Sequence, residues 1–106
     1  MFEYNTLLQR VGSLVLENDY KGAIKALDGI KDFNLREDVC KGVLVVESIK
    51  KDVARGKKVI VDIDEGTNTA FIDSLKNLSV KNPLMKYYRK NFGNQENLFV
   101  YHMSKS

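Results

Sequence analysis

Apolar residues between positions 4 and 30 recur at intervals of three and four, which is the spacing of one face of an α-helix. One stripe lies within residues 4–15 and a second within residues 20–30. The break between them, at Asn18 and Asp19, is too short for anything but an antiparallel connection between helices. The sequence therefore predicts an N-terminal helical hairpin, with its first helix over about residues 2–17.

A third and longest helix is predicted after the hairpin. Asn34 followed by Glu37 resembles a capping box with Asn in place of Ser or Thr, and Gly56 is a suitable end. The run from Val43 to Val46 would also fit a short buried strand, because β-branched residues favour pleated surfaces. The charged residues keep a helical period through this region, which favours the helix.

Two shorter helices are predicted in the second half of the chain. The first takes Thr67 or Asn68 as its cap. The second lies between Asn82-Pro83 and Gly93, because Asn suits the cap, Pro the first helical position and Gly the position just past the end. These boundary residues make the second of the two the best-defined element in the sequence.

Two segments are typical of β-strands. Lys57–Asp64 is dense in β-branched residues, and Leu98–Met103 is apolar on both faces. Two strands alone make a marginal sheet in water, so helices, a third strand or a second copy must complete it. The prediction is a single α+β domain over residues 1–106, mostly helical, with a small two- or three-stranded sheet. The strand Leu98–Met103 also allows a homodimer.

The composition excludes several classes of protein. Hydrophobic residues make up 43% and charged residues 29% of the chain, which is typical of globular domains and unlike disordered ones. No stretch reaches the ~20 apolar residues that a membrane span needs, so we expect no membrane contact. The start Met1–Asn5 lacks the basic and apolar regions of a secretory signal, which predicts a cytoplasmic protein.

The single cysteine, Cys40, fits a buried structural thiol, and His102 has no partner at metal-ligand spacing.

One segment resembles the start of phosphoryl-transfer sites. Asp62-x-Asp64 is similar to the nucleophile motif of haloacid-dehalogenase-type phosphatases, and Asp64-x-Gly66-Thr67-x-Thr69 to the first phosphate loop of actin-like and sugar-kinase ATPases. Both families are larger than this chain and need further motifs that it lacks. A strand end followed by a helix cap explains the segment more simply. We therefore expect no catalytic residue, no metal and no cofactor, with a small metal-dependent phosphoryl-transfer enzyme as an alternative.

Basic residues form two clusters. No acidic residue lies between Asp73 and Glu96, a stretch with five cations, and such an excess usually faces phosphates or acidic proteins. On the helix predicted after Asn82, Lys86, Arg89 and Lys90 project to one side. Tyr87 lies at the boundary, where a ring could stack on a base. The predicted binding residues are Lys76, Lys81, Lys86, Tyr87, Arg89 and Lys90 in this stretch, and Lys50, Lys51, Arg55, Lys57 and Lys58 in a second cluster.

These observations favour a small non-catalytic binding protein. Its basic surface is expected to contact nucleic acid or nucleic-acid-handling machinery, provided that the two clusters share one face. The alternative is a protein-interaction module, such as a phage- or plasmid-encoded inhibitor that binds an acidic host protein.

Overall fold

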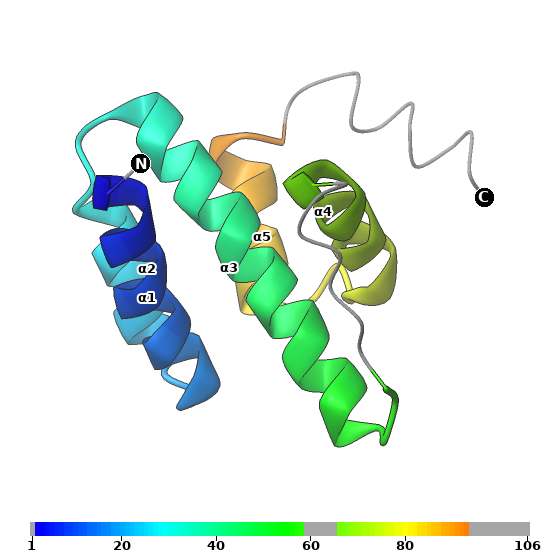
Figure 1. The fold of residues 1–106 in the computed structure, drawn as a ribbon. Helices are drawn as coiled ribbons and strands as arrows, with labels where there is room; N and C mark the ends of the chain where they lie inside the picture. The colour runs from blue at the N-terminus through cyan, green and yellow to red at the C-terminus, as the bar shows by residue number, and fades with distance from the viewer. Residues whose placement is uncertain (1, 59–65, 94–106) are drawn as a thin grey trace.

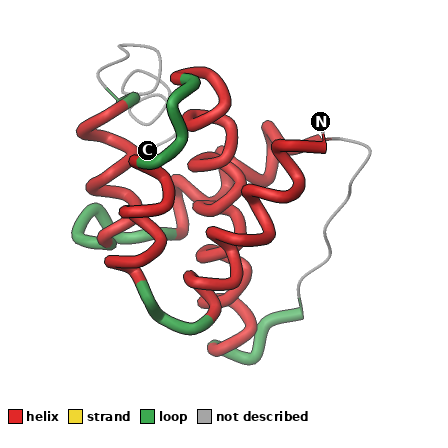
Figure 2. The backbone as a smooth tube through the Cα atoms, turned by 90° about the vertical axis from the view of Figure 1, so that its left-hand side faces the viewer, coloured by secondary structure: helices red, strands yellow, loops and turns green. Residues whose placement is uncertain are grey.

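The computed structural model describes residues 2–58 and 66–93, which form five α-helices and, within that part of the chain, no strand (Figure 1, Figure 2). The helices are α1 (Phe2–Leu16), α2 (Tyr20–Asp28), α3 (Phe33–Ala54), α4 (Gly66–Asn77) and α5 (Pro83–Asn91). The predicted α+β class is therefore wrong, and the fold of the described residues is all-helical.

The predicted sheet has no counterpart in the described residues. Lys57 and Lys58, which begin the first predicted strand, follow α3 without regular structure. The rest of that strand lies outside the described residues, as does Leu98–Met103 with the dimer contact expected through it. The helical interpretation of residues 43–46 is confirmed. Neighbouring helices bury Val43 and Leu44 and partly cover the next two valines, and this burial outweighs the preference of β-branched residues for sheets.

The end of α3 and the start of α5 lie where the sequence predicts them. Asn82 caps α5, its Oδ1 accepting a hydrogen bond from the backbone N–H of Leu84 at 2.9 Å, and Pro83 is the first helical residue. Gly56 follows the end of α3 with a φ of 78°, a conformation that glycine adopts without steric cost. Local side-chain chemistry thus determines these two helix ends.

The start of α3 differs from the prediction by two residues. The cap is Asp32, whose Oδ1 accepts a hydrogen bond from the backbone N–H of Leu35 at 3.0 Å, and Asn34 lies within the first turn. A carboxylate here satisfies a free N–H group and interacts favourably with the positive end of the helix dipole. Both residues are good caps, and the charged one takes the position.

Helix α3 is central and contacts each of the other four helices. Figure 1 shows α1 and α2 on one side of α3 and α4 on the other, with α5 behind it. The helices α1 and α2 form the predicted hairpin, whose turn holds Asn18 at a φ of 64°. Helix α5 runs antiparallel to α3, because Asn82 before its start contacts Glu47, whereas the ring of Phe92 after its end lies 5.2 Å from that of Phe33.

All five helices contribute to one hydrophobic core. Each large apolar side chain removed from water contributes about 1.5–3 kcal/mol, so this burial is the main source of stability. An aromatic group joins α4 to α5, since the rings of Phe71 and Tyr88 meet edge to face at 5.4 Å. The most deeply buried apolar residues are Val11, Val15, Ala23, Leu27, Val39, Cys40, Val43, Leu44 and Leu84.

A charged side chain also lies inside this core. Glu47 of α3 has no exposed surface, and its Oε2 accepts hydrogen bonds from Tyr20 Oη at 2.7 Å and from Asn82 Nδ2 at 2.8 Å. Its Oε1 lies 3.4 Å from the Nζ of Lys50, one turn further along α3. The buried carboxylate thus has a cation and two neutral donors, which offset the cost of removing it from water.

Lys50 extends this network to the end of α1. Its Nζ donates to the backbone carbonyl of Val15 and to the hydroxyl of Tyr20, each at 2.9 Å, and also to the side chain of Asn18. It thereby satisfies a carbonyl of the last turn of α1, where cations are favourable. One lysine and one glutamate therefore link α1, α2, α3 and the start of α5.

Removing the buried carboxylate should cost far more than removing an exposed one from the same helix. We expect Glu47→Ala to lower the free energy of unfolding by about 3–5 kcal/mol, because Lys50, Tyr20 and Asn82 lose their acceptor. Asp38→Ala is the matched control, since Asp38 is an exposed carboxylate of α3 and its removal should cost below about 1 kcal/mol. Urea unfolding followed by circular dichroism measures both, and equal losses would contradict the role given to Glu47.

Candidate functional site

The outer side of α5 carries three exposed cations. Leu84 and Tyr88 on the opposite side are buried, so burial determines how the helix is rotated about its axis. Lys86, Arg89 and Lys90 are then exposed, and no described carboxylate forms an ion pair with them. We call these three residues the α5 basic face.

Tyr87 belongs to the core and not to this face. Only 7% of its surface is exposed, and its hydroxyl donates a hydrogen bond to Asp28 Oδ1 at 2.8 Å. Burial, together with this hydrogen bond to a carboxylate, raises the pKa of Tyr87. Its ring therefore offers no open side on which a base could stack, and its role is to join α5 to α2.

The structure brings part of the first predicted cluster next to the second. Arg55 Nη1 donates a hydrogen bond at 3.0 Å to the Oδ1 of Asn77, the neighbour of Lys76 at the end of α4. Arg55 also lies 3.9 Å from Asp52, which offsets part of its charge. Lys76, in the last turn of α4, and Lys81, in the connection between α4 and α5, are both exposed. Arg55 is thus linked to the end of α4 that carries Lys76, although the two cations are distant in sequence.

The remaining predicted cations differ in how far they are exposed. Lys50 is committed to the internal network described above, so it is not available to a partner. Lys51 is half-buried, whereas Lys57 and Lys58 are exposed beyond the end of α3. The second cluster therefore contributes fewer surface charges than its sequence indicates.

The two ends of the basic surface lie far apart. The end of α5, with Lys90, adjoins Phe33 at the start of α3, as the contact between Phe33 and Phe92 shows. Arg55 follows the last residue of that same helix, α3. A helix rises 1.5 Å per residue, so Arg55 lies about 33 Å from Phe33 along the axis of α3. The α5 basic face and the cations that follow α3 thus occupy opposite ends, and Lys76 and Lys81 lie between them.

Metal-ligating side chains are not clustered in the described residues. These residues contain no group of three or more His, Cys, Asp or Glu side chains that could hold a metal ion. Asp62, Asp64 and His102 lie outside the described residues. Cys40 is fully buried, and this burial, with a smaller effect from nearby Glu37, raises its pKa to about 12. A thiol in that state is a poor nucleophile.

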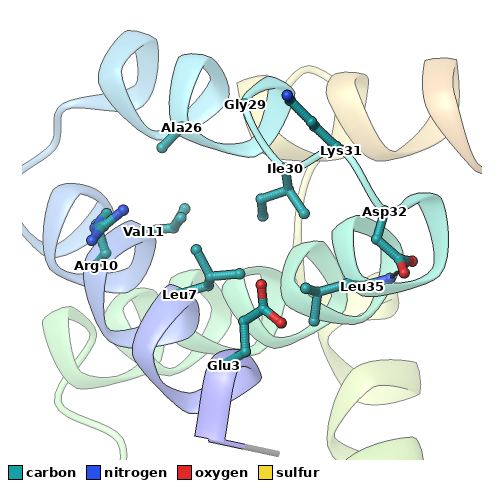
Figure 3. A pocket seen from close by; sticks show the side chains of 10 residues that line it. All are labelled: Glu3, Leu7, Arg10, Val11, Ala26, Gly29, Ile30, Lys31, Asp32 and Leu35. Atoms are coloured by element: carbon teal, nitrogen blue, oxygen red, sulfur yellow. Dashed lines mark hydrogen bonds between the residues drawn. The ribbon is translucent and has the colours of Figure 1, made fainter.

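A hollow that was not predicted from the sequence lies between α1 and the turn that joins α2 to α3 (Figure 3). Its volume is about 640 Å³, within the range of ligand sites. Arg10, Lys31 and Asp32 lie around its margin, and the carboxylate of Glu3 projects between Leu7 and Leu35. The lining residues are Glu3, Leu7, Arg10, Val11, Ala26, Gly29, Ile30, Lys31, Asp32 and Leu35. The available signal was the spacing of Glu3, Leu7 and Arg10, which places two opposite charges around a leucine on one helix face.

Comparisons with protein-family models, with curated proteins and with solved structures found no match for this chain. Among the described residues, no helix combines the length and the apolar character needed to cross a membrane.

The buried thiol gives a direct test of the core. We expect Cys40 in the folded protein to react with iodoacetamide at pH 8 far more slowly than in the unfolded chain. A pKa of about 12 in place of 9.0 alone reduces the thiolate fraction about a thousandfold. Mass spectrometry of timed samples, with and without urea, measures both rates, and rates within tenfold of each other would contradict the buried position.

Alkaline pH should destabilise the fold. Burial raises the pKa of Tyr88 to about 12 and also raises that of Tyr87, so the folded chain holds these protons more tightly than the unfolded chain. Their stabilising effect is complete below pH 10 and is lost as the pH rises above it. We expect the urea midpoint to fall between pH 10 and 12, and to fall less in Tyr87→Phe. A midpoint independent of pH in that range would be inconsistent with these shifts.

Proposed function

We propose that this protein is a small non-catalytic binding protein that contacts nucleic acid through the α5 basic face, with Lys76 and Lys81 extending the contact. The observation that carries this proposal is the arrangement of Lys86, Arg89 and Lys90, which are exposed on one helix face without a described carboxylate partner. Clustered cations of this kind attract phosphate groups and release the counterions bound to them.

The expected mode of binding is contact with the phosphate backbone. Tyr87 and Tyr88 are buried, so α5 presents no aromatic ring for base stacking. Lysine and arginine contacts to phosphates position a protein on nucleic acid but carry no sequence information. We therefore propose binding that depends weakly on sequence and strongly on salt, in a cytoplasmic protein.

A second candidate is an acidic protein partner, such as a host factor bound by a phage- or plasmid-encoded inhibitor. Two aliphatic side chains favour it: Val80 and Val53 are 60% and 61% exposed, beside Lys81 and near Arg55 respectively. Aliphatic side chains among cations add little to phosphate binding but suit an acidic protein surface with apolar residues. A pull-down from lysate with and without nuclease separates the two candidates, since only nucleic-acid-mediated capture is lost on digestion.

Binding to nucleic acid should depend on the α5 basic face and on salt. We compare the protein with the triple variant Lys86→Gln, Arg89→Gln and Lys90→Gln in anisotropy titrations of labelled single-stranded and duplex DNA and RNA at roughly 50–300 mM salt. Loss of three phosphate contacts should make the slope of log affinity against log salt shallower by about 2–3.

The matched control removes the same charge elsewhere. Lys21, Lys25 and Lys31 are exposed on α2 and the turn after it, and changing all three to Gln should leave most of the affinity intact. Absence of binding by the unmodified protein at the lowest salt, or equal losses in the two triple variants, would rule out the proposed surface.

A further inference from the structure

One side of α1 carries two opposite charges around an apolar side chain. Glu3 and Arg10 are exposed, and Leu7 between them is half-buried at the wall of the hollow. Glu3 and Arg10 are separated by two helical turns, about 10.5 Å along the axis, so they cannot pair with each other within one helix. Neither forms an ion pair with any other described residue.

The hollow beside these residues leaves Leu7 and Leu35 half-buried, above a floor that includes the buried side chain of Ile30. Figure 3 shows Leu7 and Ile30 projecting toward one another from α1 and from the turn after α2, with Leu35 of α3 at the side. Arg10, Lys31 and Asp32 lie around the margin. A concave apolar surface with a charged margin is typical of protein-binding sites, where the centre is desolvated and the rim is polar.

We propose that the hollow and the adjoining face of α1 bind a second copy of this chain, with the two α1 helices antiparallel about a two-fold axis near Leu7. In this arrangement Glu3 of each protomer faces Arg10 of its partner, and Leu7 and its apolar neighbours lie between the two ion pairs. A two-fold contact joins the same surface on both copies, so that surface must be its own complement.

The charge pattern is what selects a second copy as the occupant. Rotation by 180° about a point midway between residues 3 and 10 exchanges the negative and positive positions, so each charge meets its opposite. A partner of one sign, such as a nucleic acid or a uniformly acidic protein, would be attracted by one of these two side chains and repelled by the other. The proposed contact is also compatible with the α5 basic face, because no residue of α5 lines the hollow.

Two copies joined in this way would carry two α5 basic faces. If these engage one nucleic-acid strand, the second contact becomes intramolecular and the apparent affinity rises without any new contact. The self-association itself does not depend on nucleic acid, so its test is independent of the proposed binding function.

Charge reversal at the two positions tests the arrangement. We measure molar mass by sedimentation velocity between about 5 and 500 μM at low salt for the unmodified chain, for Glu3→Arg and for Arg10→Glu. The unmodified chain should approach twice the monomer mass as concentration rises. Each single variant places like charges opposite one another, and self-association should weaken at least roughly tenfold.

The decisive sample is an equal mixture of the two single variants. In a mixed pair, one copy is positive at both positions and the other is negative at both, so every facing contact is attractive and dimer should reappear. Lys21→Glu, which changes an exposed charge on α2 away from the hollow, is the control and should associate like the unmodified chain. The proposal is overturned if the unmodified chain stays monomeric throughout, if the single variants associate as strongly as it does, or if mixing restores nothing.

Discussion

The buried carboxylate of Glu47 is the interaction on which the arrangement of the helices depends. A charge inside a protein is costly unless a cation and several donors surround it. Here those groups come from three places: Tyr20 at the start of α2, Lys50 on α3 and Asn82 before α5. A shift of α2 or α5 along α3 would remove one of these donors, so the single carboxylate sets the positions of both helices.

The same interaction orients the candidate binding surface. Asn82 uses both atoms of its amide, because Nδ2 donates to Glu47 while Oδ1 caps the first turn of α5. The start of α5 is thereby attached to the middle of α3, and burial of Leu84 and Tyr88 sets the rotation of the helix. The α5 basic face therefore lies on the outer side of the helix, exposed to solvent. An internal polar contact thus determines which way the surface charges face.

Much of the local structure could be predicted from the sequence, whereas the binding surfaces could be predicted only in part. The hairpin, the long third helix and the Asn82-Pro83 start of α5 follow from apolar spacing and capping chemistry, and the structure confirms them. The predicted site was partly misjudged at Tyr87 and Lys50, because spacing along one helix says nothing about what the neighbouring helices cover. Tyr87 lies under α2 through Asp28, and Lys50 is enclosed by the end of α1.

The sequence by itself determined the end of α3 at Gly56 and the start of α5 at Asn82-Pro83, because caps, proline, glycine and the period of apolar residues act within a few positions. It also determined that α5 is amphipathic with its cations on one side. Only the tertiary structure decided that a glutamate belongs in the core, that Tyr87 is buried against Asp28 and that the α5 basic face lies at the opposite end of α3 from Arg55. These outcomes depend on which groups from distant segments share the low-dielectric interior, and that proximity exists only after the helices have packed together.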